Sequence, residues 1–296
     1  MKIESVTALL KFSVAIFFGF LASTASADGH NSLIQTVARI TGEIEAQAGF
    51  AAYDLESGQR WGYQADQRFA MSSTFKTLAC AALLHRVDAG QESLERSVSF
   101  SESDLVTYSP ITEKYAGGQA MTLSDLCEAA LTMSDNTAAN LVLRALGGPD
   151  KVTSFARGLG DDVTRLDRWE TELNEAVPGD YRDTTTPNAM VKNLQSLLLG
   201  DALSGKSRDQ LNDWLKSNQV ADGLFRAAVP EGWIVADRSG AGGFGSRSIT
   251  AIIWPPERQP IVVVLYLTQT EASFSERNEA IAEIGEAIVL AVDLGL

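Results

Sequence analysis

The sequence predicts an α+β fold, in which a five-stranded antiparallel sheet is flanked by terminal helices and an all-helical domain is inserted in the middle. β-Rich runs broken by Gly and Pro gather near the two ends of the chain, at 50–55, 60–63, 232–236, 247–254 and 260–267. Between them, apolar residues recur at helical spacing. Strands from both ends can therefore share one sheet, and we expect the functional site in the cleft between the sheet and the helical domain.

The first 27 residues predict a secretory signal rather than a part of the fold. Lys2 and Lys11 flank its start, the run 12–21 is almost wholly apolar, and Ala25-Ser-Ala27 supplies small residues for cleavage. The alternative is an uncleaved membrane anchor, but this apolar run is short for a bilayer. We therefore expect cleavage after Ala27 and export to the periplasm, with no membrane contact afterwards.

The sheet domain is expected to be discontinuous, built from residues 28–71 and 215–296. Its first helix is predicted over 32–48 and its last over 274–290, because each segment carries an apolar stripe at helical spacing. Both helices are expected to pack on a face of the sheet.

Residues 72–214 are expected to form the all-helical domain, with no strand between its helices. Helices are predicted over 74–89, 122–133, 137–146, 150–157, 187–199 and 207–217. The fifth has Thr186 as N-cap, Pro187 at its first position and Gly200 just past its end. The charged stretch 165–186 shows neither the helical nor the strand periodicity of apolar residues. A loop of this length in a compact domain is usually functional. We expect an Ω-type loop over 168–183.

Composition argues against several classes of function. The net charge of −14 and the absence of a basic cluster argue against nucleic-acid binding. Two histidines, His30 and His85, are too few for a zinc hydrolase, so we expect neither a metal nor a cofactor. His85 is also about 18 Å along a helix from Ser73, which argues against a Ser-His-Asp triad.

The two cysteines, Cys80 and Cys127, both lie in predicted helices. An oxidising compartment favours a disulfide between them, and the alternative is a pair of buried free thiols.

The segment Ser73-Thr-Phe-Lys76 is a candidate nucleophile site. Ser73 opens an apolar helix, whose unpaired N–H groups favour negative charge, and Lys76 lies on the same helix face at i+3. A serine hydroxyl needs such a partner before it attacks. The alternative is a helix-capping serine beside an ordinary surface lysine.

Two further motifs contain polar side chains of the kind found in hydrolytic sites. Ser134-Asp-Asn136 joins two predicted helices, although three capping residues at such a junction are also what structure alone favours. Glu170 and Asn174 are four residues apart in the long loop and could hold a water, for which Glu170 would be a general base. The alternative for Glu170 is a solvent-facing side chain.

The segment Arg238-Ser239-Gly240-Ala241 ends a predicted strand, and Arg247 lies on the next one. A cation, a hydroxyl and open backbone N–H groups at a strand edge can receive a carboxylate. The alternative is a glycine-rich hairpin with incidental arginines.

These four motifs, in this order, resemble those of the class A serine β-lactamases. The resemblance covers essentially the whole chain after residue 27. It implies that Ser73 is the acylated nucleophile, that the N–H groups of Ser73 and Ala241 form the oxyanion hole, and that Ser134 passes a proton to the leaving nitrogen. It further implies that Asn136 binds the substrate's side-chain carbonyl and that Glu170 activates the hydrolytic water.

The resemblance also implies roles for residues outside these motifs. Tyr108 would line the cleft entrance, Cys80 and Cys127 would form the family's commonest disulfide, and Arg168 and Asp183 would close the neck of the loop. The Glu170–Thr171 peptide bond would be cis, although many relatives have proline where this chain has Thr171.

The fourth motif departs from the usual family pattern, because it begins with Arg238 instead of lysine. Arginine stays charged and offers a bidentate fork, so it can bind a carboxylate but cannot shuttle a proton. Within the family, R-S-G resembles the carbenicillin-hydrolysing enzymes, which accept carboxypenicillins.

Two other functions compete with this one. Cell-wall transpeptidases and carboxypeptidases share the first two motifs but lack the loop that contains Glu170. A receptor that binds the antibiotic and signals would need a membrane connection beyond the signal. We therefore expect a monomeric, exported penicillin hydrolase that confers antibiotic resistance and takes a small β-lactam as its partner.

Overall fold

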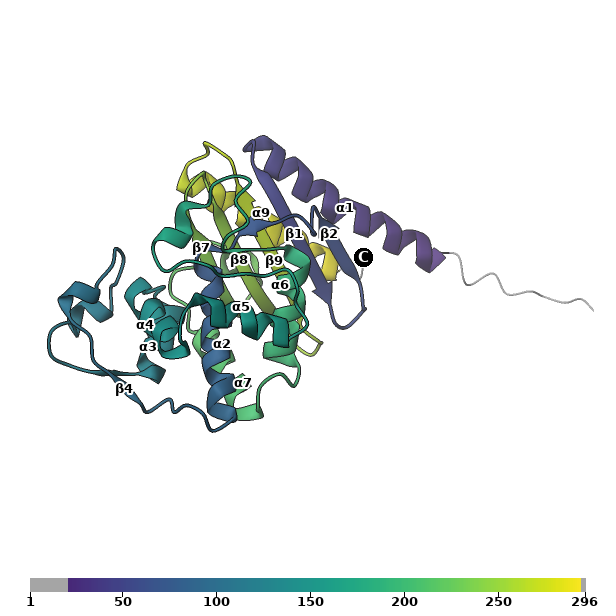
Figure 1. Ribbon diagram of the computed structural model, residues 1–296. Helices are drawn as coiled ribbons and strands as arrows, with labels where there is room; N and C mark the ends of the chain where they lie inside the picture. Colours follow the sequence, from purple (N-terminus) through teal and green to yellow (C-terminus); the bar gives the residue numbers. More distant parts are fainter. Residues whose placement is uncertain (1–20, 294–296) are drawn as a thin grey trace, which may run out of the picture.

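A computed structural model describes residues 21–293 and contains the predicted five-stranded antiparallel sheet (Figure 1). Its strand order is β2-β1-β9-β8-β7, so strands from both ends of the chain pair directly. The strands are β1 (Gln47–Asp54), β2 (Arg60–Tyr63), β7 (Ile234–Ala241), β8 (Arg247–Trp254) and β9 (Ile261–Thr268). The central pairing joins β1 to β9, with Phe50 opposite Leu265. The fold predicted from the sequence is thus confirmed.

Apolar side chains on both faces of the sheet are buried. In β9, Val263 and Leu265 pack with the terminal helices α1 (Leu21–Glu43) and α9 (Phe274–Asp293) and with the short helix α8 (Phe225–Ala228). Val262 and Val264 instead join the core that contains the helices of the middle segment. A strand covered on both faces reads as a continuous apolar run, which is the pattern of Ile261–Leu267.

Helix α2 (Phe75–Asp88) lies at the centre of the helical region, and its first ten residues are all buried. Around it lie α3 (Leu123–Thr132), α4 (Asn136–Leu146), α5 (Pro149–Gly158) and α7 (Gly205–Lys216), whereas α6 (Pro187–Leu194) packs against β1 and β9 of the sheet (Figure 1). The predicted N-cap of α6 is confirmed, because the Thr186 hydroxyl accepts a hydrogen bond from the Ala189 N–H. A π-helical turn, Gln195–Leu199, continues α6 as far as Gly200.

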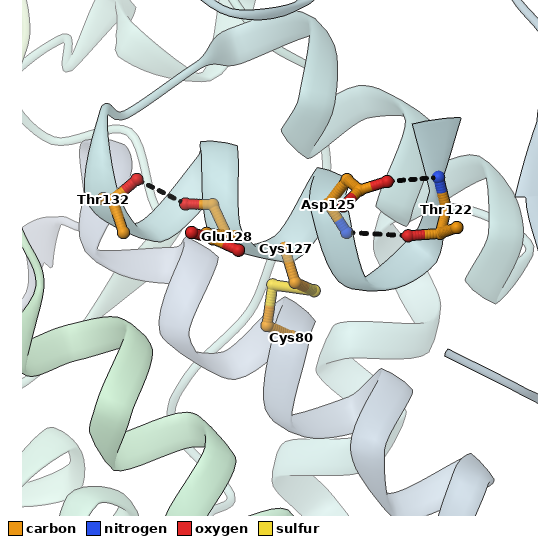
Figure 2. Close-up of a disulfide and its surroundings, with 6 residues drawn as sticks. All are labelled: Cys80, Thr122, Asp125, Cys127, Glu128 and Thr132. Atoms are coloured by element: carbon orange, nitrogen blue, oxygen red, sulfur yellow. Dashed lines mark hydrogen bonds between the residues drawn. A yellow bond between two sulfur atoms is a disulfide. The ribbon is translucent and has the colours of Figure 1, made fainter. Parts of the chain in front are cut away.

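A disulfide joins Cys80 in α2 to Cys127 in α3, with their Cα atoms 5.8 Å apart (Figure 2). Beside it, Thr122 and Asp125 form a capping box at the start of α3. The predicted disulfide is therefore confirmed, and it links two helices of the same core.

The boundaries of the first helix differ from the prediction of 32–48. Helix α1 ends at Glu43, Glu45 has a positive φ, and the chain enters β1 at Gln47. The buried Ala48 suits either a helix or a strand, and its pairing with Leu267 of β9 decides for the strand. A local pattern contains no information about that distant partner.

The expectation that no strand lies within the helical region was also wrong. Strand β3 (Phe69–Ala70) pairs with β6 (Thr184–Thr185), and β4 (Ser97–Val98) pairs with β5 (Met121–Thr122). Two-residue strands are too short to show an alternating pattern, so the sequence did not reveal them. Single 3₁₀ turns occur at Ser72–Thr74, Glu102–Asp104, Thr112–Lys114 and Glu172–Glu175.

The predicted signal, residues 1–27, falls mainly outside the described residues, and the described part of it belongs to α1. Among the helices of residues 21–293, none combines the length and apolarity that crossing a bilayer requires.

Candidate active site

Ser73 lies in the 3₁₀ turn Ser72–Thr74, which leads directly into α2. Lys76 is in the first turn of α2, and its Nζ donates a hydrogen bond to Ser73 Oγ at 3.0 Å. The lysine side chain is fully buried, whereas Ser73 keeps 8% of its surface exposed. The i, i+3 spacing therefore has the consequence predicted from the sequence, an amine held against an accessible hydroxyl.

The junction between α3 and α4 brings a second hydroxyl to Ser73. Ser134 Oγ donates to Ser73 Oγ at 3.1 Å, and the Ser134 carbonyl accepts from Lys76 Nζ at 2.9 Å. Of the three junction residues, Asp135 is the structural cap, since its carboxylate accepts from the N–H groups of Ala138 and Thr112. The capping interpretation therefore holds for Asp135, while Ser134 faces the site.

The side chain of Asn136 bridges the lysine and the cleft wall. Its Oδ1 accepts from Lys76 Nζ at 2.6 Å, and its Nδ2 donates to the Thr107 carbonyl at 2.8 Å. Its orientation is thus set at both ends of the amide group.

The long loop places Glu170 against Lys76. Arg168 and Asp183 pair at 2.6 Å across the neck of the loop, as the resemblance implies. Glu170 Oε1 lies 3.1 Å from Lys76 Nζ, and both side chains have no exposed surface. Asn174 Nδ2 donates to the other carboxylate oxygen of Glu170 at 2.5 Å. A carboxylate and an amide are therefore held together beside the lysine that contacts Ser73.

Asn140 orients the backbone of Glu170, which the sequence analysis missed. Its Oδ1 accepts from the Glu170 N–H and its Nδ2 donates to the Glu170 carbonyl, both at 2.9 Å. The peptide bond that follows, Glu170–Thr171, is cis. Since Asn140 is four residues after Asn136 on α4, helical spacing was a signal that could have identified it.

Burial controls the charge of Lys76. The loss of hydration lowers the pKa of its ammonium to about 8, and the attraction of Glu170 opposes that shift only in part. The charge of Arg238 lowers the pKa further. An amine with such a pKa is able to give and take a proton near neutral pH.

Strand β7 ends beside Ser73 and brings Arg238, Ser239, Gly240 and Ala241 to the cleft. A Cβ added at Gly240 would lie 3.0 Å from the Met71 carbonyl oxygen and 3.1 Å from the Ser73 nitrogen. Only glycine lets the strand approach the serine this closely. The end of β7 is therefore in backbone contact with the turn that contains Ser73.

The two arginines of the cleft are buried, with 1% of Arg238 and 5% of Arg247 exposed. Arg238 donates through Nη1 to the Leu131 carbonyl and through Nε to the Ser239 carbonyl. Arg247 donates through Nη1 to the Gly240 carbonyl and through Nε to Asn278 Oδ1. Burial lowers the pKa of each to about 10, and the charge of Arg238 contributes to the lowered pKa of Arg247. Both guanidinium groups remain cationic at neutral pH.

These groups surround a cavity of about 310 Å³. Most of the predicted site residues line it, namely Ser73, Tyr108, Ser134, Asn136, Asn174, Arg238, Ser239, Gly240, Ala241 and Arg247. Lys76 and Glu170 lie behind Ser73 and do not line the cavity. Tyr108 has 53% of its surface exposed. The structure thus brings all of the predicted catalytic and substrate-binding residues to one cleft or directly behind it.

The cavity also has two lining residues that the sequence analysis did not select, Val220 and Phe274. Asn278, which holds Arg247, was missed as well. An apolar side chain and residues of a terminal helix have no motif that would mark them.

Comparisons with known proteins identify the family of the chain. Residues 32–292 match the model of the Beta-lactamase enzyme family. The chain is 50% identical to Beta-lactamase AER-1 of Aeromonas hydrophila over 92% of its length and 90% of the relative. It is 51% identical to Beta-lactamase CARB-4 of Pseudomonas aeruginosa over 84% of its length and 86% of the relative.

Solved structures lead to the same family. An ancestral class A β-lactamase superposes with a TM-score of 0.86 at 52% identity, over 88% of this chain and 99% of that one. The putative class A β-lactamase PenP from Rhodopseudomonas palustris superposes with a TM-score of 0.86 at 50% identity, over 88% of this chain and 99% of that one. With a buried Ser–Lys–Glu cluster at the head of its central helix and half of its residues identical to these relatives, the chain belongs to the class A β-lactamases, serine hydrolases of β-lactams.

Proposed function

We propose that this β-lactamase hydrolyses penicillins, carboxypenicillins included, through an acyl-enzyme on Ser73. One observation carries the proposal: Ser73 Oγ lies 3.0 Å from Lys76 Nζ and 3.1 Å from Ser134 Oγ, with Glu170 directly behind the lysine. A nucleophile, two proton carriers and a carboxylate therefore share one hydrogen-bonded cluster.

In the acylation step, Ser73 Oγ bonds to the carbonyl carbon of the lactam. The hydroxyl proton passes to Lys76 or Glu170, which are in contact with each other. The backbone N–H groups of Ser73 and Ala241 stabilise the oxyanion. The carbon–nitrogen bond then breaks, and Ser134 delivers its hydroxyl proton to the leaving nitrogen. Lys76, whose Nζ lies 3.3 Å from Ser134 Oγ, then returns a proton to Ser134.

In the deacylation step, a water attacks the ester carbonyl carbon. Glu170 takes a proton from that water, and Asn174 holds the water in place. The 2.5 Å contact between the two side chains supports this joint role. The ester bond to Ser73 breaks, and the serine oxygen recovers a proton from the same cluster. The product is the ring-opened acid.

Arg238, Ser239 and Arg247 would bind the carboxylate on the fused ring, since they supply two buried cations and a hydroxyl at one end of the cavity. Asn136 would receive the side-chain carbonyl, and Tyr108 would line the entrance. The Arg238-Ser-Gly240 motif supports carboxypenicillins as substrates, because it resembles that of the carbenicillin-hydrolysing enzymes.

The signal-like residues 1–27 support export to the periplasm, and we propose a monomer there. The proposed division assigns residues 28–71 and 215–296 to a sheet domain and residues 72–214 to a helical domain. The cavity is lined by residues from both parts, such as Ser134 and Arg238, which supports this division.

The experiment that tests the proposal is hydrolysis of benzylpenicillin and of carbenicillin by the purified mature protein. Absorbance would give the turnover rate, and mass spectrometry of the intact chain would detect any adduct. Rapid turnover of both substrates with no lasting adduct is the expected result. A persistent adduct on Ser73 without turnover would instead indicate a penicillin-binding receptor or peptidase and would remove the role given to Glu170.

A further inference from the structure

Phe274 is an exposed aromatic residue in the wall of the active-site cavity. It is the first residue of α9, 51% of its surface is exposed, and it lines the cavity together with Arg247. An aromatic side chain left half in water at the mouth of a cavity has no role in the core, so its contacts within the cleft are informative.

The ring of Phe274 contacts two guanidinium groups. Its centroid lies 4.7 Å from Cζ of Arg247 and 5.6 Å from Cζ of Arg277. Both distances are within the range in which the negative face of an aromatic ring attracts a cation. Phe274 therefore links the buried arginine of the cleft to a second arginine nearer the surface.

Neither arginine has a carboxylate partner among the described residues. Arg247 donates to the Asn278 amide oxygen and the Gly240 carbonyl, and Arg277 donates to the carbonyls of Ser273 and Ser246. The two cations, with Arg238 close by, repel each other, which contributes to the lowered pKa of Arg247. The contact with the Phe274 ring thus adds to the favourable interactions of the Arg247 charge before an anion binds.

We propose that Phe274 is a positioning residue for the substrate carboxylate. Its ring holds the guanidinium of Arg247 in the orientation set by Asn278 and Gly240, so that the group is ordered before the substrate enters. Pre-ordering a side chain removes a cost that binding would otherwise carry. This inference rests on the proposed function, and it applies to β-lactams that bear a carboxylate on the fused ring.

The test compares Phe274→Leu, which keeps apolar volume but removes the ring, with Phe274→Tyr, which keeps the ring. For benzylpenicillin, Phe274→Leu is expected to raise KM by roughly three- to tenfold, the range that a cation–π contact supplies, with kcat within about twofold. A rise in KM at constant kcat marks a loss of uniform substrate binding. Phe274→Tyr, which keeps the ring, should have the same KM as the wild type.

The methyl ester of benzylpenicillin separates positioning from packing, because it lacks the carboxylate. If Phe274 acts through Arg247 and the carboxylate, Phe274→Leu leaves kcat/KM for the ester unchanged. An equal loss on acid and ester, or a tyrosine variant as impaired as the leucine one, would overturn the inference. Thermal melting of both variants checks that the fold is intact.

A matched control comes from the cation–π pair on the far edge of the sheet, where the Arg60 guanidinium lies 3.5 Å from the ring centroid of Tyr53. Tyr53→Leu removes an aromatic ring from an arginine outside the cleft and should leave KM unchanged. A parallel rise in KM for this variant would also count against the inference. If the wild-type protein failed to hydrolyse benzylpenicillin, the proposed function itself would be wrong. If it turned over normally and Phe274→Leu matched it, only the role of Phe274 would be lost.

Discussion

Lys76 and Glu170 form an ion pair of 3.1 Å in which neither side chain has any exposed surface. The pair joins the central helix to the long loop, and it puts both candidate bases for acylation in contact with each other. Removing one partner of a buried pair leaves the other charge uncompensated, so substitutions at either position also change the proton affinity of the residue that remains.

Glu170→Ala should trap the acyl-enzyme. Ser73 and Ser134 keep their contacts, so acylation continues, while the water loses its general base. A general base contributes about 10²- to 10⁴-fold, so we expect deacylation of benzylpenicillin to slow by at least about 10²-fold. Mass spectrometry of the intact chain should show an adduct of one penicillin.

The control for this variant is Glu172→Ala, which removes an exposed carboxylate two residues further along the same loop. It should turn over like the wild type. Rapid turnover by Glu170→Ala would exclude Glu170 from deacylation.

The pH dependence of acylation should shift when the charge of Glu170 is removed. Glu170 is the main group that raises the pKa of Lys76, which burial lowers to about 8. Glu170→Gln removes that attraction, so the pKa of Lys76 should fall below 8, and the free amine should predominate at lower pH. Because Lys76 is then the remaining base, the acylation rate should rise with pH through a midpoint below 8.

Rapid-quench mass spectrometry of the Glu170→Gln acyl-enzyme between roughly pH 5 and 9 measures this midpoint. A second variant that also carries Lys76→Ala should lose the rising limb. A midpoint that stayed at 8 or moved higher would contradict the assigned coupling.

Arg238→Ala should weaken the binding of benzylpenicillin and of carbenicillin to a similar degree. The guanidinium is buried beside Ser239 at the end of the cavity where the fused-ring carboxylate would bind, and both substrates share that group. Hydrogen bonds to charged groups contribute about 1.5–3 kcal/mol, which corresponds to roughly 10- to 100-fold in KM. Steady-state kinetics on both substrates measures the effect.

Arg39→Ala is a suitable control for a lost arginine, since Arg39 pairs with Glu43 and Glu283 on the exposed faces of α1 and α9. Its kinetics should match the wild type. A loss confined to carbenicillin in Arg238→Ala would place Arg238 against the side-chain carboxylate instead.

Removal of the disulfide should reduce stability more than activity. The bond between Cys80 and Cys127 spans a sequence separation of 47 residues, and the chain-entropy model assigns about 4 kcal/mol to a loop of that length. The double substitution of both cysteines by alanine should lower the free energy of unfolding by about that amount in urea titrations. At 25 °C, kcat/KM should stay within about threefold of wild type, because the cross-link acts mainly on the unfolded chain.

Reduction of the wild-type protein offers a second measurement without mutation. The melting temperature should fall in dithiothreitol, and the double variant should show no further fall. An unchanged melting temperature on reduction would contradict the prediction.

Much of the fold could be predicted from local sequence. The apolar run Ile261–Leu267, the stripe of α9 and the caps around Thr186 are patterns that extend over one element, and the structure matches them closely. The motifs that contain Ser73, Ser134, Glu170 and Arg238 were also visible, because each depends on residue types at short spacing. Their grouping in one cleft was expected only through their order and the family resemblance.

Other features depend on partners far away in the sequence. The register of Ala48 follows from Leu267, and the strand pair of Phe69 and Thr185 is too short to show a period. Asp135 and Ser134 belong to one junction, yet the first caps backbone N–H groups while the second contacts Ser73. No local pattern distinguishes them, since both are residues that favour caps.

The sequence alone therefore determined the family, the order of the elements and the set of side chains with chemistry to offer. Only the tertiary structure decided the pKa values of these side chains and which of them contact one another. Lys76 has a pKa of about 8 because folding removes it from water beside Glu170 and Arg238, and Phe274 meets Arg247 because α9 begins beside β8. Hydration loss and contact between distant segments arise only when the chain is packed, and for that reason they could not be predicted from spacing or composition.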